Sequence, residues 1–202
     1  MSSIVIAGNT SGAITIAAPA EAGLNTLTLP ASTGTMALTS DIPASGKTLQ
    51  VVNLVYSTQS SMTIGTSDTA ITGMNLNITP LGAGSKFRID VRLFGETNSA
   101  WDTVFNIHRG TARINTTSNL NYHGLSMMTQ TYGGGANDST TAEILNLTTI
   151  DSTGSTVGTT LTYILVASSP SNKTLWINRS FLAPTGTAET GVSEIIITEI
   201  GA

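Results

Sequence analysis

Cysteine is absent from the 202-residue chain, so no disulfide can stabilise its fold. Charged residues make up only 10% of the sequence and aromatic residues 5%. The formal net charge is −4 and the eight Lys and Arg residues are scattered, which argues against the clustered cations that a nucleic-acid surface needs. No apolar run approaches the roughly 18 residues that cross a bilayer. We therefore expect neither nucleic acid nor a membrane as a partner.

Motifs for catalysis or metal binding are missing as well. The two histidines, His108 and His123, have no companion at metal-ligand spacing, and Arg109 disfavours a cation beside His108. Residues 45–48 (SGKT) resemble the end of a phosphate-binding loop, but Asp41 stands where that loop requires glycine. We predict no catalytic residue, no metal site and no cofactor, and we expect each histidine to hold a backbone hydrogen bond.

Small and β-branched residues dominate what is present. The chain contains 35 Thr, 22 Ser and 20 Gly, a composition that favours pleated strands joined by tight turns. No amphipathic window longer than about two turns is free of Gly and Pro, so at most one or two helical turns are expected. The sequence therefore predicts an all-β protein.

Residues 1–42 carry four short apolar doublets at alternate positions. These are Ile4/Ile6, Ile14/Ile16, Leu27/Leu29 and Met36/Leu38. Such spacing between turn-forming residues predicts short β-strands with one buried face. So few apolar side chains cannot bury a core of their own within so short a segment. We interpret residues 1–42 as an intertwined β-strand anchor whose core is completed by identical segments of a homotrimer.

The rest of the chain has the pattern of an independent β-domain. Residues 43–47 are the predicted linker and residues 48–202 the predicted domain. The candidate strands lie at 48–56, 69–79, 86–94, 101–109, 121–129, 141–150, 159–167, 174–180 and 192–200. Strands of this number joined by Gly- and Ser-rich loops predict an antiparallel β-sandwich of jelly-roll type.

Individual strands differ in how many of their faces are apolar. At 86–94, the apolar side chains occupy every second position from Phe87 to Leu93, and charged residues fill the alternate positions. This pattern predicts one dry and one wet face. Segments 161–167 and 195–197 are apolar on both sides. They should be central strands, or strands whose outer face another subunit covers.

Some residues of the C-terminal domain are also candidates for contacts. Trp101 and Trp176 are interpreted as core or subunit-interface anchors in preference to sugar platforms. Long loops are expected at 115–121, 132–140 and 183–191, where such scaffolds carry variable contacts. Within the second loop, Tyr132, Asn137 and Asp138 are the candidate outer-loop contacts.

Two parts of the sequence carry a resemblance to a known group of proteins. Residues 11–41 (SGAITIAAPAEAGLNTLTLPASTGTMALTSD) resemble a segment of virion structural proteins from tailed bacteriophages, many with marine or cyanobacterial hosts. Residues 102–110 (DTVFNIHRG), 175–179 (LWINR) and 191–200 (GVSEIIITEI) are similar to the β-domain that often follows it. The resemblance implies a phage protein on the outer surface of the virion, trimeric, of the head-decoration or tail-fibre type.

The expected function is that of a non-enzymatic, homotrimeric virion structural protein. Decoration of the capsid, as a cement protein that contacts the major capsid protein, is favoured because the β pattern begins close to Met1 and leaves no room for a tail-binding domain. The alternative is a short tail fibre that contacts tail proteins and binds the host surface, with a host glycan as a candidate partner. A polysaccharide depolymerase, which needs only two carboxyl groups about 5 to 10 Å apart, is the remote alternative.

Overall fold

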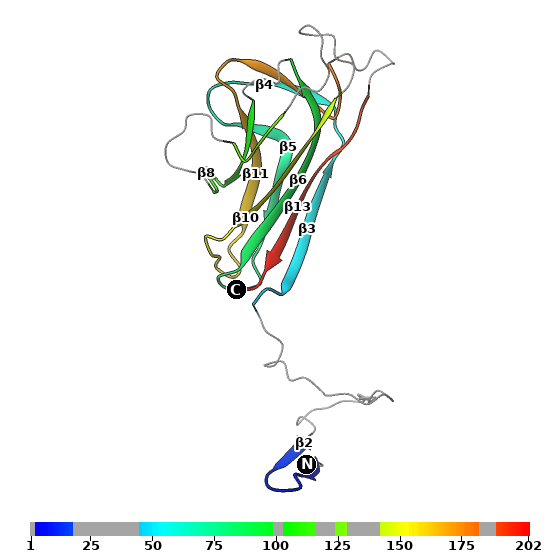
Figure 1. Cartoon of the computed structure of the whole chain (residues 1–202), viewed down its shortest axis with the longest axis vertical. Coiled ribbons are helices and arrows are strands. Elements are labelled where there is room, and N and C mark those ends of the chain that lie inside the picture. Colours follow the sequence, from blue (N-terminus) through cyan, green and yellow to red (C-terminus); the bar gives the residue numbers. More distant parts are fainter. Residues whose placement is uncertain (1–2, 18–44, 99–102, 116–123, 129–141, 182–188) are drawn as a thin grey trace. The chain divides into compact units, whose positions relative to one another are not determined.

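The structure is a computed structural model that describes residues 3–17, 45–98, 103–115, 124–128, 142–181 and 189–202. Regular secondary structure in these ranges is exclusively β-strand (Figure 1). The chain divides into two compact units, Met1–Ile42 and Pro43–Ala202. The predicted all-β class, with an antiparallel β-sandwich in the C-terminal part, is confirmed.

The first unit contains a β-hairpin. Strands β1 (Ser3–Ala7) and β2 (Ala13–Ala17) pair antiparallel, and their register places Ile4 opposite Ile16 and Ile6 opposite Ile14. The connecting turn closes through the amide of Gly8, which donates to the carbonyl of Gly12 at 2.9 Å. Because directly opposed residues share a face, the four isoleucines line one side of the hairpin.

The second unit is built from the remaining strands. Their bounds are β3 (Thr48–Tyr56), β4 (Ser60–Ile64), β5 (Thr69–Ile78), β6 (Lys86–Thr97), β7 (Val104–Arg109), β8 (Ala112–Arg113), β9 (Ser126–Met127), β10 (Glu143–Asp151), β11 (Leu161–Ser168), β12 (Lys173–Ile177) and β13 (Ser193–Ile200). Every pairing between them is antiparallel.

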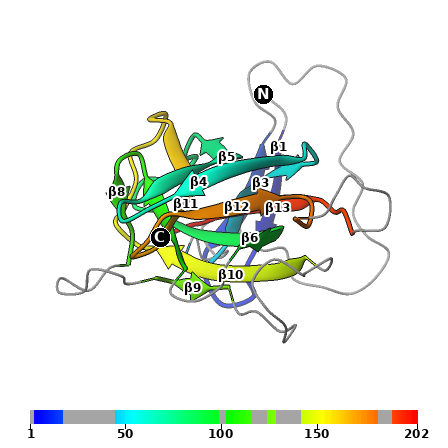
Figure 2. The same ribbon diagram turned by 90° about the horizontal axis from the view of Figure 1, so that it is seen from above.

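These strands form two sheets. In the first, the order is β3-β13-β6-β12-β4, with β10 also paired to β6; we name it the β6 sheet (Figure 2). In the second, the order is β5-β11-β7-β8, with β9 also paired to β7; we name it the β11 sheet. Most neighbours in each sheet come from distant parts of the sequence, such as β3 and β13 or β5 and β11. The double-sided apolar strands β11 and β13 are central, as predicted.

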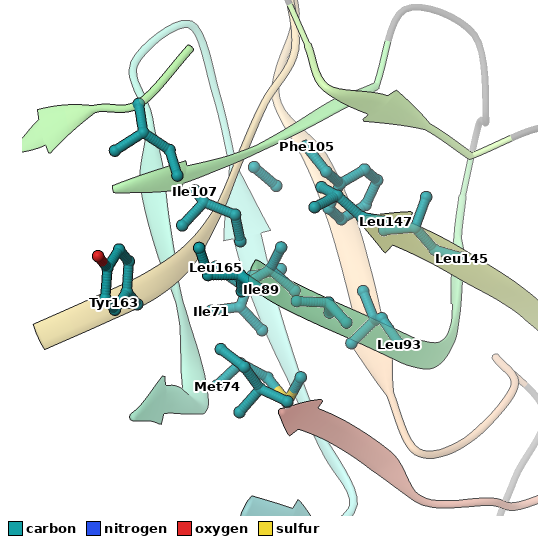
Figure 3. Packing of buried hydrophobic residues seen from close by; sticks show 14 of the residues in the cluster. Ile71, Met74, Ile89, Leu93, Phe105, Ile107, Leu145, Leu147, Tyr163 and Leu165 are labelled. Carbon is teal, nitrogen blue, oxygen red and sulfur yellow. The ribbon is translucent and has the colours of Figure 1, made fainter. Parts of the chain in front are cut away.

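The hydrophobic core lies between the two sheets. Ile89 and Leu93 from the β6 sheet meet Phe105, Ile107 and Leu165 from the β11 sheet (Figure 3). All five side chains are fully buried. Burial along β6 alternates from Lys86 to Leu93 in the predicted phase, which confirms its dry and wet faces.

Several strand boundaries differ from those predicted. The short strands β4 and β8 were absent from the expected set. β8 has only two residues, and β4 carries a single alternating doublet, Met62/Ile64, that the sequence interpretation overlooked. Strand β12 ends at Ile177, short of the predicted residue 180. Asn178 adopts a positive φ of 59°, and its side-chain amide donates to the carbonyls of Tyr56 and Thr58 at 2.7 and 3.0 Å. The backbone amide of Asn178 still donates to the carbonyl of Phe94 in β6 at 2.8 Å.

The predicted linker is partly integrated into the sandwich. The amide of Gly46 donates to the carbonyl of Gly201 at 2.9 Å, and the amide of Gly201 donates to the carbonyl of Lys47 at 2.8 Å. Gly46 has φ of 78°, a value that glycine adopts without strain. The segment that resembles a phosphate-binding loop therefore extends the β3–β13 pairing.

Candidate functional site

The hairpin exposes the apolar residues that were predicted to anchor the chain. Ile4, Ile6, Ile14 and Ile16 are 44% to 69% exposed, and Val5 on the opposite face is 61% exposed. The described residues of this unit provide no second layer against which these side chains pack. A hairpin alone is marginally stable in water, so a surface of this kind favours association. Leu27, Leu29, Met36 and Leu38 lie outside the described residues.

The richest polar cluster in the described sandwich surrounds Asp151, at the end of β10. The hydroxyl of Tyr163 donates to Asp151 Oδ2 at 2.8 Å, and Arg109 Nη1 lies 3.1 Å from the same oxygen. The amide of Thr153 donates to Oδ1 at 3.0 Å, and its hydroxyl contacts this oxygen too. The Asp151 side chain is 3% exposed. This carboxylate thus joins the β6 sheet to the β11 sheet at one edge of the sandwich.

A second charged cluster lies beside it on the outer side of the β11 sheet. Asp68 accepts from Arg113 through both carboxylate oxygens, and His108 Nε2 lies 2.6 Å from its Oδ2. Burial pulls the pKa of Asp68 upward, but the hydrogen bonds from Arg113 and His108 outweigh it and hold the pKa below its ordinary value. The same hydrogen bond raises the pKa of Arg113.

An open pocket of about 390 Å³ connects the two clusters across strand β8. Its lining residues are Arg109, Ala112, Arg113, Ile114, Asn115, Asp151, Ser152 and Thr153. Asn115 has a positive φ of 53°. Its side-chain amide donates to the carbonyl of Ile150 at 2.7 Å and so bridges the two sheets. The pocket offers guanidinium, amide and hydroxyl groups, a set that suits hydrogen bonding to a polar ligand.

The titration behaviour of these clusters fits structural ion pairing. The lowered pKa of Asp68 makes it a poor general acid near neutral pH. Burial, followed by the hydrogen bond to Asp151, raises the pKa of the Tyr163 hydroxyl far above its usual range. Among the described residues, no three of His, Asp and Glu gather as metal ligands.

The expected hydrogen bond of His108 is corrected by the structure. Its Nε2 lies against the carboxylate of Asp68, 40 residues away in sequence, where a backbone group was expected. The reason is the register of β7 with β8, which sets His108 opposite Arg113 and brings both side chains to one carboxylate. His123 lies outside the described residues.

Trp176 packs within the sandwich. Its side chain is buried, and its ring contacts Phe181 edge to face with centroids 4.9 Å apart. Trp176 is not part of the hydrophobic cluster between the two sheets, and the choice between a core and a subunit-interface role stays a prediction. Trp101, Tyr132, Asn137 and Asp138 fall outside the described residues.

The sequence interpretation considered His108 and Arg109 but missed their carboxylate partners, Asp68 and Asp151. One signal was available for Asp151: it continues the inward phase of Leu145 and Leu147 on β10. A carboxylate at a core position indicates a buried, paired charge. No comparable local signal marks Asp68, whose partners in β7 and β8 are 40 and 45 residues away.

Comparison with known proteins identifies no relative. No family model matches the chain, and a search of curated proteins gives no significant match. The described part of the chain contains no helix with the length and apolarity of a membrane span.

Proposed function

We propose that this chain is a non-enzymatic, homotrimeric structural protein on the outer surface of a tailed-phage virion. In this proposal the first unit holds the trimer together and attaches it, and the sandwich is the exposed head. Its most favoured placement is on the capsid, as a decoration protein that cements neighbouring copies of the major capsid protein.

The exposed isoleucine face of the hairpin carries this proposal. Four isoleucines in direct cross-strand register form a continuous apolar surface on a two-stranded element that has no second layer in the described residues. Identical hairpins arranged around an axis would bury this surface. A unit of this kind, separate from a sandwich with a complete core, is suited to assembly rather than to catalysis.

Light scattering coupled to size-exclusion chromatography tests the oligomer. The full chain should elute at three times 20.8 kDa. Replacing Ile14 and Ile16 together with Asp should give the monomer, because unpaired charges in a shared apolar core cost several kcal/mol each. The matched control replaces Asn9 and Thr10 with Asp in the exposed turn of the same hairpin, which should leave the trimer intact. A monomeric parent chain contradicts the proposal.

Particles that lack this chain test the placement on the head. A protein that binds only the assembled shell stabilises it by mass action. Such particles should therefore release their genome at a lower temperature than complete particles, yet still adsorb to cells. Unchanged heat resistance would contradict the cement role.

A short tail fibre that binds the host surface is the second candidate, and the polar pocket favours it. Arg109, Arg113 and Ser152 lie in the lining of one cavity and carry guanidinium and hydroxyl groups. Such groups pair well with the adjacent hydroxyls of a surface glycan. Under this alternative, particles without the chain keep their heat resistance and fail to adsorb.

A further inference from the structure

The outer face of the β6 sheet carries exposed aliphatic side chains at both of its edges. On edge strand β3 these are Val51 and Val55, and on edge strand β10 they are Ile144 and Ile150. Their exposed fractions lie between 45% and 57%. Exposed apolar side chains are ordinary when scattered, but a symmetrical placement on one face indicates a contact surface.

The outer face of the β11 sheet differs in chemistry. On its edge strand β5, the exposed positions are small or polar: Ala70, Thr72, Asn75 and Asn77. Asn77 is opposite Thr162 in the neighbouring strand, and the two side chains are hydrogen-bonded at 2.7 Å. This face suits contact with water, so the two sides of the sandwich are not equivalent.

Charged residues of both signs lie at the centre of the outer face of the β6 sheet. The strand register places Glu194 between Val55 and Arg92, and Thr198 between Val51 and Arg88. Beside them, Asp90 forms an ion pair with Arg88 at 2.9 Å. Two arginines and two carboxylates therefore share the centre of the face. Lys86, exposed at the end of β6 on the same face, leaves the face with one excess positive charge, so two copies can meet with little repulsion.

We propose that this face is the contact surface between sandwiches, with edge β3 of one copy packed against edge β10 of the next. This inference rests on the trimer proposed above and names a contact that the hairpin does not supply. A β3-to-β10 contact is heterologous, so each copy uses both edges and rotation closes the contacts into a ring. A two-fold contact between two β3 edges would leave both β10 isoleucines in water.

The absence of native cysteine allows a direct test by single-cysteine labelling of the full chain. The labelling rates of Val55→Cys and Ile144→Cys report how accessible the β3 and β10 edges are. Thr72→Cys on the outer face of the β11 sheet is the matched control. Each purified variant is exposed to a polyethylene-glycol maleimide while its mass is measured by light scattering. In the trimer, labelling at positions 55 and 144 should be at least about tenfold slower than at position 72. Dilution to the monomer should remove the difference.

The outcomes separate this inference from the trimer proposal. A trimeric mass with equally fast labelling at positions 55, 144 and 72 overturns the contact surface and leaves the hairpin as the trimer interface. Protection at position 55 alone overturns the β3-to-β10 arrangement, because it indicates a two-fold contact. A monomeric mass overturns the trimer itself.

Discussion

The hairpin and the inner face of strand β6 carry the same kinds of aliphatic residue but differ in burial. Ile14 and Ile16 stand at alternate positions of β2 and are exposed, whereas Ile89 and Leu93 stand at alternate positions of β6 and are fully buried. The difference is the second layer, because the β11 sheet covers one face of β6. An alternating pattern thus tells which side chains share a face, while the covering layer decides whether that face is dry.

Truncation of an aliphatic side chain to Ala should show the largest difference in free energy of unfolding between the two regions. Leu165→Ala removes a fully buried side chain between the sheets and should lower the free energy of unfolding by about 2 to 5 kcal/mol. Ile14→Ala in the hairpin should leave unfolding of the sandwich unchanged. Urea denaturation followed by tryptophan fluorescence measures both. Equal effects would show that the hairpin contributes to the core of the sandwich.

The next largest difference in free energy of unfolding should be between removal of a buried and of an exposed carboxylate. Asp151→Ala leaves the Tyr163 hydroxyl and Arg109 without their buried partner and should cost about 3 kcal/mol. Asp90→Ala breaks a surface ion pair with Arg88 and should cost less than about 1 kcal/mol. Urea denaturation of each variant measures the difference. A cost below 1 kcal/mol at Asp151 would contradict its role in joining the sheets.

Two glycines at positive φ sharpen the contrast between the regions. At Gly73, φ is 78° and an added Cβ would lie 2.2 Å from the Tyr56 ring, so Gly73→Ala should cost about 2 kcal/mol. Gly12 in the hairpin turn has φ of 79° but no atom within 4 Å of such a Cβ. Gly12→Ala should therefore leave the melting temperature of the sandwich unchanged, as differential scanning calorimetry can check.

The smallest expected effect concerns acid stability. Glu199 is fully buried, and although burial raises its pKa, hydrogen bonds from Gln50, Leu81, Gly82 and Ser85 outweigh this and lower it. A carboxyl whose pKa is lower in the folded state stabilises above its ordinary pKa, and this stability is lost as pH falls through the folded value.

Stability should thus decline as pH falls below about 5, since the unfolded chain then binds more protons. In Glu199→Gln, the free energy of unfolding should depend less steeply on pH between about 5 and 3. Chemical denaturation at a series of pH values measures this slope. If the free energy of unfolding of Glu199→Gln depends on pH as steeply as that of the parent chain, Glu199 does not contribute to the loss of stability in acid.

Much of the fold was predictable because strand pattern is local. The alternation in β6 and the double-sided apolar character of β11 and β13 gave the correct faces and central positions. The two-residue strand β8 was missed because it is too short for any periodicity, and the single doublet Met62/Ile64 of β4 was overlooked. The charged clusters were missed because their partners come from separate strands.

The sequence by itself determined the strand-forming character of the chain and which residues of each long strand face the same side. Steric preferences of β-branched residues and two-residue periodicity act over a few positions and are visible in any short window. The tertiary structure decided which strands are neighbours, and therefore which distant groups pair. Gln50 and Glu199, 149 residues apart, share a hydrogen bond of 2.6 Å because β3 and β13 are adjacent. Burial of a charge depends on such long-range pairing, which no local pattern encodes.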